Sequence, residues 1–348
     1  MYQFQCDYTG GCLPEILKLL TETNNEELPG YCEDQICKEA SSLILNACSL
    51  THDQAEVFWL PSGTLANLSV LTTVLRSNES VIASEDAHIF TAEAGAVEAH
   101  GHKIETSASK DGKIQASLIE KLCTDYLSRD PIGQAHLTRP AAVYLAFPSE
   151  FGTVYSLEGL RQISSVCRKY GLFLYVDGAR LAYGLSVSDA ALSDLAQLSD
   201  AFYIGGTKCG ALIGEAVVIK DAAARRRFLG TLRMCGGLLA KGRLVGAAFK
   251  AFFTDDLYFR VGKEAVDKAQ RIQKAFTDSG VEMYIDSPTN QIFPLVNERQ
   301  LSELSKCCRF KVLKRTESAK YLLRFCTSWS TEETAVQLLV ETIKKLPR

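Results

Sequence analysis

The chain has 348 residues, of which 47% are hydrophobic and 23% charged, which is typical of a globular protein with one large domain and a smaller one. Its formal net charge of −3 gives no reason to expect nucleic-acid binding. No run is long and apolar enough to predict a membrane span, and the first residues, MYQFQCDYTGG, lack the basic and apolar segments of a signal peptide.

Short apolar runs alternate with amphipathic segments from about Gln54 to Ile219. Strands are predicted at 56–60, 80–83, 141–147, 173–176, 201–204 and 216–219. Helices are predicted at 63–76 and 157–170, where apolar residues recur at helical spacing. This alternation predicts an α/β fold with a mostly parallel central sheet that is flanked by helices on both faces.

The pattern changes after Asp221. The chain is predicted to be mainly helical to about Asp278. Strands at 292–296, 310–313 and 321–325 then precede a helix over 331–345. We therefore expect a smaller α+β domain at the C-terminal end. The expected division is an N-terminal segment of residues 1–20, a large domain of residues 21–245 and a small domain of residues 246–348.

Three predicted strands end in groups that are suited to chemistry, and ligands bind at the carboxyl ends of strands in an open α/β sheet. The first group is Ser62-Gly63-Thr64, where a strand gives way to a helix. Free N–H groups at a helix start bind anions, and a glycine lets a phosphate approach the backbone closely. A serine that only caps the helix is the alternative. No Walker A sequence is present.

The second group is Asp177, at the end of the predicted strand FLYV. A carboxylate in such a place needs a partner, because an unpaired buried charge is costly. One interpretation is a structural ion pair with Arg180. The other is that Asp177 binds the protonated ring nitrogen of a pyridine cofactor, which keeps the ring an electron sink.

The third group is Lys208, which lies between small residues in GGTKCG after another strand. An exposed loop lysine is one interpretation, and a lysine that bonds covalently to a carbonyl cofactor is the other. A phosphate cradle, a carboxylate and a lysine occur in this order along fold-type I enzymes that use pyridoxal phosphate (PLP). Together the three groups indicate PLP.

The chain resembles low-specificity L-threonine aldolases and related β-eliminating lyases over nearly its whole length. The matching stretches are PGYCEDQ (29–35), PSGTLANL (61–68), EDAHIFTAEAGAVE (85–98), FPSEFGTVYSLEGL (147–160), VDGARLAYGL (176–185), GGTKCGALIGEAVV (205–218) and LRFCTSWST (323–331). VDGARL and GGTKCGALIGEA are quite specific when they occur together. The resemblance implies a fold-type I PLP-dependent transferase-like fold.

The resemblance also implies roles for single residues. Lys208 is expected to hold the cofactor covalently, and His88 to stack on its ring and to take part in catalysis. The other expected cofactor-binding residues are Ser62, Gly63, Thr64, Asp177, Arg180, Thr207 and Lys241, the last of them across a subunit boundary. The expected substrate-binding residues are Asp7 in the N-terminal segment, Tyr31, Asp34 and Arg324. A structural ion pair is the alternative for Arg324, and a loop histidine for His88.

The chain departs from the family pattern at three places. Cys6 stands where many relatives have a serine, and Cys32-Glu33 replaces the commoner Gly-Asp. Pro148-Ser149-Glu150 replaces an Asn-Thr-His stretch whose histidine is often assigned to base chemistry. The base therefore stays open between His88 itself and a water that His88 positions with Glu93 or Glu150.

The expected reaction is retro-aldol cleavage of L-threonine or L-allo-threonine to glycine and an aldehyde, in threonine breakdown and glycine formation. β-Elimination and transamination are alternatives, because the same cofactor residues serve them. The presence of Lys208 argues against a non-catalytic PLP-fold protein, and the lack of GxGxxG after a strand argues against a nicotinamide dehydrogenase.

The twelve cysteines are scattered from Cys6 to Cys326, without CxxC pairs or zinc-like spacing. This favours reduced cysteines in a cytoplasmic compartment, and no metal site is expected. The resemblance implies a homodimer or homotetramer. It also implies that the protein binds a small amino-acid substrate.

Overall fold

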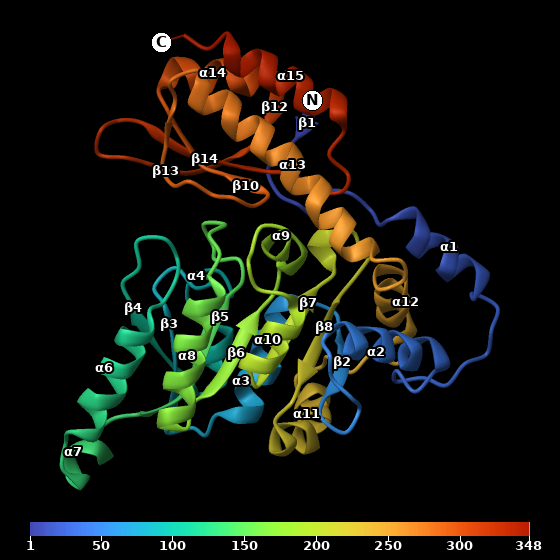
Figure 1. Cartoon of the computed structure of the whole chain (residues 1–348), viewed down its shortest axis with the longest axis vertical. Coiled ribbons are helices and arrows are strands. Elements are labelled where there is room, and N and C mark those ends of the chain that lie inside the picture. The colour runs from blue at the N-terminus through green and yellow to red at the C-terminus, as the bar shows by residue number, and fades with distance from the viewer. Residues whose placement is uncertain (348) are drawn as a thin grey trace.

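The computed structural model describes residues 1–347, as a large lower domain and a smaller upper one (Figure 1). The large domain is built on a seven-stranded sheet. Its order is β2 (Glu56–Leu60), β8 (Glu215–Ile219), β7 (Ala201–Gly205), β6 (Phe173–Asp177), β5 (Arg139–Ala146), β3 (Glu79–Ser84) and β4 (Lys103–Ser107). β8 alone runs in the direction opposite to that of the other six strands. The predicted mostly parallel sheet is therefore confirmed.

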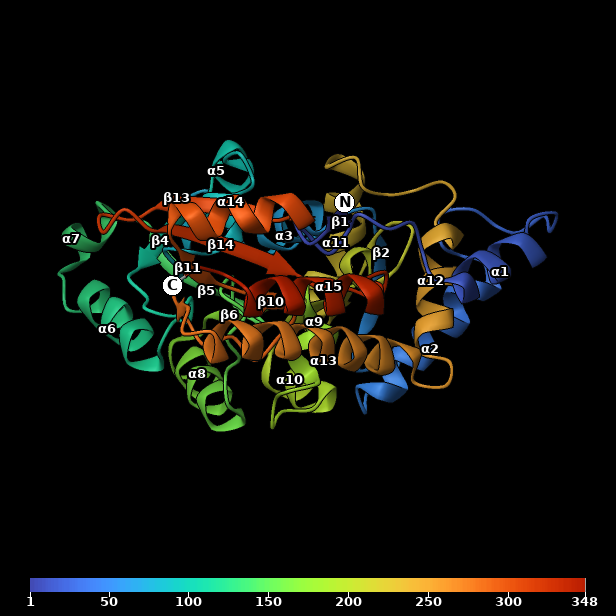
Figure 2. The same ribbon diagram turned by 90° about the horizontal axis from the view of Figure 1, so that it is seen from above.

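Helices cover both faces of this sheet, because its strands are apolar on both sides and must be shielded from water. One face packs against α3 (Gly63–Val74), α5 (Ala96–Ala99) and α11 (Ala222–Met234). The other face packs against α6 (Ala116–Leu127), α8 (Leu157–Tyr170), α9 (Leu181–Leu185) and α10 (Leu192–Leu198). Figure 2 shows the two layers from above. Two short helices, α4 (His88–Thr91) and α7 (Pro131–Ala135), complete this part.

Helices that were not predicted lie before the first strand of the sheet. α1 (Pro14–Glu22) and α2 (Gln35–Ala47) both pack against α12 (Arg243–Phe252). The chain start belongs elsewhere, because β1 (Tyr2–Gln3) pairs with β12 (Cys308–Arg309) and Phe4 lies in the core of the small domain. The N-terminal segment therefore runs across both domains. None of the helices within residues 1–347 combines the length and apolar character that a membrane crossing needs.

The small domain combines helices with an antiparallel sheet, as predicted for its class. The strands are β9 (Glu282–Met283), β10 (Gln291–Ile292), β11 (Pro294–Val296), β13 (Lys311–Arg315) and β14 (Tyr321–Cys326). β14 lies centrally and pairs with β10, β11 and β13. α14 (Glu298–Cys307) and α15 (Glu333–Lys344) complete its apolar core.

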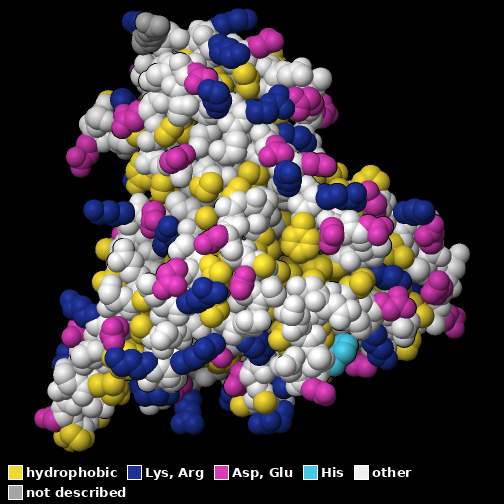
Figure 3. Space-filling view, in the orientation of Figure 1, with side chains coloured by type: hydrophobic (Ala, Val, Ile, Leu, Met, Phe, Trp, Pro, Cys, Tyr) yellow, Lys and Arg dark blue, Asp and Glu magenta, His cyan; other side chains and the backbone are white. Residues whose placement is uncertain are grey.

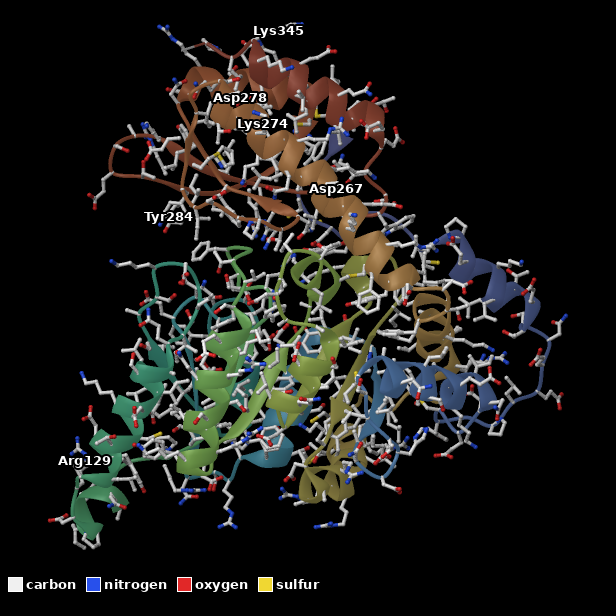
Figure 4. The ribbon with its side chains drawn as sticks, in the orientation of Figure 1. Arg129, Asp267, Lys274, Asp278, Tyr284 and Lys345 are labelled. Carbon is white, nitrogen blue, oxygen red and sulfur yellow. The ribbon has the colours of Figure 1, made fainter. Side chains whose placement is uncertain are left out.

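The long helix α13 (Leu257–Asp278) joins the two domains. Its first half, to Val266, belongs to the core of the large domain, and its second half, from Ala269, to that of the small one. Figure 4 shows this path, with Asp267 near the middle of the helix and Asp278 within the small domain. Hydrophobic side chains gather where the domains meet (Figure 3). We therefore propose a boundary inside α13, in place of the expected one after residue 245, because α12 packs on α2 of the large domain.

Candidate active site

A cleft of about 1030 Å³ lies at the carboxyl ends of the strands, below the small domain. It contains nine of the residues singled out from the sequence, namely Ser62, Gly63, Thr64, His88, Asp177, Arg180, Thr207, Lys208 and Arg324. Arg324 comes from β14 of the small domain, and the others come from the large domain. Substrate and cofactor groups would therefore meet between the two domains.

The first turn of α3 forms one end of this cleft. Ser62 caps the helix, since its Oγ accepts a hydrogen bond from the Leu65 N–H at 3.3 Å. Gly63 and Thr64 follow as the first helical residues, whose N–H groups have no partner inside the helix. Both interpretations of this segment are thus compatible: the serine caps the helix, and the helix start faces a cleft as an anion site does.

Lys208 lies in a 3-10 helix (Thr207–Cys209) directly after β7 and is half-buried. Its carbonyl accepts a hydrogen bond from the Tyr183 hydroxyl at 2.6 Å, which holds the turn in place. Within residues 1–347 its Nζ makes no ion pair or hydrogen bond, and the residue lines the cleft. The amine is therefore available to a ligand.

Asp177 ends β6 and is almost fully buried. The Tyr144 hydroxyl and the Asn67 amide donate to Oδ2 at 2.6 and 3.0 Å, and the Ala179 N–H donates to Oδ1 at 2.9 Å. A carboxylate has about four acceptor positions, so one remains for a donor in the cleft.

The ion pair between Asp177 and Arg180, one of the two interpretations of Asp177, is not formed, so this alternative was wrong. Arg180 instead binds Asp7 of the N-terminal segment, with Nε–Oδ2 and Nη2–Oδ1 distances of 2.7 and 3.1 Å. The Asn290 amide donates to the same carboxylate at 2.9 Å. Burial alone would raise the pKa of Asp7, but Arg180 and Lys208 outweigh it, so the pKa lies below its ordinary value. Asp7 thus holds Arg180 in place and does not line the cleft.

His88 begins α4 and joins a chain of buried polar groups. Its Nδ1 lies 2.7 Å from Glu93 Oε1, which also accepts a hydrogen bond from the Asn67 amide at 2.7 Å. The same amide reaches Asp177, so Asn67 links the two carboxylates. The hydrogen bond to Glu93 raises the pKa of His88, against the effect of burial. Burial in turn raises the pKa of Glu93 and that of Glu150, which lines the cleft.

Arg324 was expected to need a carboxylate partner. Its guanidinium forms no ion pair with the residues that the structure describes. Nη2 donates to the Gln5 carbonyl at 3.3 Å, and Nε is buried without any partner. A buried donor without a partner is costly, so the side chain suits a ligand carboxylate.

Besides Asp7, three of the singled-out residues lie outside the cleft of their own chain. Asp34 caps α2 by accepting from the Cys37 N–H at 2.9 Å. Tyr31 is exposed, and its N–H donates to the Ala240 carbonyl at 3.0 Å, next to the exposed Lys241. Tyr31 and the loop of Lys241 therefore lie together on the surface, outside the cleft of their own chain. Lys241 was expected to act across a subunit boundary.

Several residues of the site were not singled out from the sequence. Asn67, Tyr144 and Tyr203 lie in segments where the apolar pattern predicts core packing. Glu215 opens β8, is buried, and accepts from the Gly206 N–H at 2.9 Å. Burial raises its pKa to about 7. A polar group inside an apolar strand pattern is the signal that could have marked them.

The residues present fit PLP. The cleft combines a helix start for the phosphate, a carboxylate with one free acceptor position for the ring nitrogen, an unpaired amine for the carbonyl group and an imidazole on its wall.

Comparisons with known proteins find relatives of this chain. The family model for beta-eliminating lyases matches residues 31–298. A low specificity L-threonine aldolase from Pseudomonas sp. (strain NCIMB 10558) is 30% identical over 98% of this chain and 97% of its own length. A threonine aldolase structure from Leishmania major is 35% identical, with a TM-score of 0.95 and 99% of both chains covered.

A more distant structure shares the fold alone. It is serine palmitoyltransferase from S. paucimobilis with bound PLP, 14% identical with a TM-score of 0.69, covering 99% of this chain and 86% of that one. The fold class predicted from the sequence is thereby confirmed, as is the resemblance on which it rested. From the matched span and the identity to its relatives, the chain belongs to the beta-eliminating lyase family.

Proposed function

We propose that this protein is a PLP-dependent carbon–carbon lyase that cleaves L-threonine and L-allo-threonine to glycine and acetaldehyde. The observation that carries the proposal is the meeting of Lys208, Asp177 and His88 with Arg324 of the other domain in one cleft. The names of the most similar relatives support the choice of substrate.

Each part of the cofactor has a residue suited to hold it. Lys208 Nζ is the covalent anchor, and the start of α3 at Ser62, Gly63 and Thr64 receives the phosphate. Asp177 would hold the ring nitrogen in its protonated form, and Arg180 would bind the ring hydroxyl. Bound PLP supplies an electron-withdrawing ring that accepts the electron pair of the broken bond.

Arg324 orients the substrate by binding its carboxylate. A guanidinium can hold a carboxylate through two parallel hydrogen bonds, which fixes direction as well as distance. By fixing the carboxylate, Arg324 would determine which bond at the substrate Cα is cleaved.

His88 serves as the base for the β-hydroxyl group. Because Glu93 Oε1 already accepts from Asn67, it acts as an acceptor toward His88 Nδ1 as well, which places the imidazole hydrogen there. Nε2 then carries the lone pair that takes the β-hydroxyl proton. The pKa of His88 is raised by Glu93, which strengthens the base.

A homodimer or homotetramer accounts for the remaining residues. Tyr31 and Lys241 would reach the cleft of a neighbouring subunit, and Asp34 would hold their loop. The exposed hydrophobic side chains of Met234 and Leu244 lie close to Lys241 in sequence and support an interface there. Twelve free cysteines, most of them buried, support a reducing cytoplasmic compartment.

The test is an absorbance spectrum of the purified protein with PLP, before and after L-threonine is added, with acetaldehyde and glycine assayed together. A visible cofactor band and both products are expected, and Lys208→Ala should abolish turnover. Ammonia and a keto acid in place of acetaldehyde would assign the protein to β-elimination instead. Near-normal turnover by Lys208→Ala would refute the role of the lysine.

A further inference from the structure

Three buried tyrosines lie side by side under the cleft, on the sheet face that α3 covers. They are Tyr144 on β5, Tyr175 on β6 and Tyr203 on β7, and each is at most 1% exposed. Tyr144 is the register partner of Tyr175, and their ring centroids are 6.0 Å apart. The hydroxyl of Tyr144 donates to Asp177 at 2.6 Å, and that of Tyr175 donates to Asn67 Oδ1 at 3.0 Å.

Tyr203 differs from its two neighbours because its hydroxyl makes no hydrogen bond to any residue in the range 1–347. The residue nevertheless lines the cleft. A Cβ atom added at Gly63 would lie 2.8 Å from this hydroxyl oxygen, which places the phenol directly against the start of α3. Its oxygen is not among the fully buried polar atoms that lack a partner, so the hydroxyl is open to the cleft, where a ligand can accept a hydrogen bond from it.

We propose that the Tyr203 hydroxyl donates a hydrogen bond to the phosphate of the cofactor, from the sheet side of the cradle. Among the other hydroxyls nearby, that of Thr64 is also free within the described residues, and two are partly engaged. Ser62 Oγ accepts from Leu65, and Thr207 Oγ1 accepts from the Gly214 N–H at 3.1 Å. The phosphate has three charged oxygens, more than the first turn of one helix satisfies.

This assignment gives Gly63 a second function besides close approach to the phosphate. Any side chain there would displace the phenol, because 2.8 Å is shorter than a carbon–oxygen contact allows. The next atom of Tyr203, the ring carbon Cζ, lies at 3.5 Å, which is an ordinary contact. The glycine and the hydroxyl are therefore matched to each other.

The first experiment compares PLP with pyridoxal, which lacks the phosphate, by spectroscopic titration of the cofactor-free protein. Tyr203→Phe should weaken PLP binding by about tenfold to a hundredfold, the effect of one hydrogen bond to a charged group. Pyridoxal binding should stay unchanged, which also shows that the variant is folded. Unchanged PLP binding, or an equal loss for both ligands, would overturn the proposal.

Tyr175→Phe is the matched control, because it removes a phenol of the same layer that is bonded to Asn67. Any effect of this change reaches the ring through Asn67 and Asp177, so it should act alike on PLP and pyridoxal. The ratio of the two affinities should stay at the wild-type value in this variant and fall only in Tyr203→Phe.

The second experiment places Gly63→Ala in two backgrounds. In the wild type the new methyl group meets the Tyr203 hydroxyl, whereas in Tyr203→Phe only the carbon at 3.5 Å remains. Gly63→Ala should therefore weaken PLP binding more in the wild type than in Tyr203→Phe, and equal losses would refute the contact. Because this inference rests on the proposed cofactor and not on the reaction, protein that binds PLP but fails to cleave threonine would leave it standing.

Discussion

Replacing Asp7 with Asn should cost the protein a large part of its stability. Asp7 is 1% and Arg180 8% exposed, and the carboxylate receives three hydrogen bonds, two of them from Arg180. The asparagine leaves the guanidinium charge buried without a counter-ion. Removing one partner of a buried ion pair costs about 3–5 kcal/mol. We expect a loss of this size in the free energy of unfolding, measured by urea denaturation of the cofactor-free protein at neutral pH.

The control is Glu333→Gln, which breaks a bidentate ion pair between Glu333 and Arg271. Both of these side chains are about half exposed. Solvent screens such a pair, so stability should change little. The pKa of Asp7 is lowered, so the ionised pair stabilises above the ordinary value of 3.8, and its contribution disappears as the pH falls below it. The wild type and Asp7→Asn should therefore converge in acid. A loss no larger than that of the control would refute the reasoning.

Three further outcomes follow from the site. In Glu93→Gln the pKa of His88 should fall. Because the base must be unprotonated, the acid limb of the pH profile of kcat/KM should then move to lower pH. An acid limb that does not move would exclude His88 as that base. Burial raises the pKa of Glu215 from 4.5 to about 7, so ionisation of Glu215 lowers the stability of the wild type as the pH rises. The free energy of unfolding of Glu215→Gln, relative to the wild type, should therefore increase by up to about 3 kcal/mol from acid to alkaline urea melts. A difference that stays constant with pH would contradict this. Arg324→Gln should raise KM for L-threonine by about tenfold or more at unchanged PLP affinity, and a change below about twofold would remove Arg324 from substrate binding.

Six of the seven strands of the central sheet could be predicted because they are continuous apolar runs between turns. The strand β4, with the sequence KIETS, has no such run and was not predicted. The runs ending at Leu60, Asp177 and Gly205 also fixed where chemistry should lie, since parallel strands bring their carboxyl ends to one edge. Ser62 and Lys208 follow two of these strands and line the cleft, as does Asp177. Strand order and the domain boundary need contacts between distant segments, and sequence periodicity does not contain them.

The partners of the site residues could not be predicted for the same reason. Arg180 is three residues from Asp177, yet it pairs with Asp7, which lies 173 residues away near the start of the chain. Asn67 sits on a helix whose pattern predicts burial, and its bonds to Asp177 and Glu93 exist only once α3 lies on the sheet. Local spacing identifies which groups need partners, and the tertiary fold selects them.

The length of the shared helix α13 sets the position of the small domain relative to the large one. Gly262 lets the helix touch the backbone of Ala182 in the large domain, while residues from Ala269 onward carry the sheet that holds Arg324. Each residue of an α-helix advances it by about 1.5 Å and turns it by about 100°. A single residue inserted between Gly262 and Ala269 would swing Arg324 out of the cleft, with no side chain of the site altered. The number of residues in this segment of α13 is therefore as much a determinant of substrate recognition as the arginine itself.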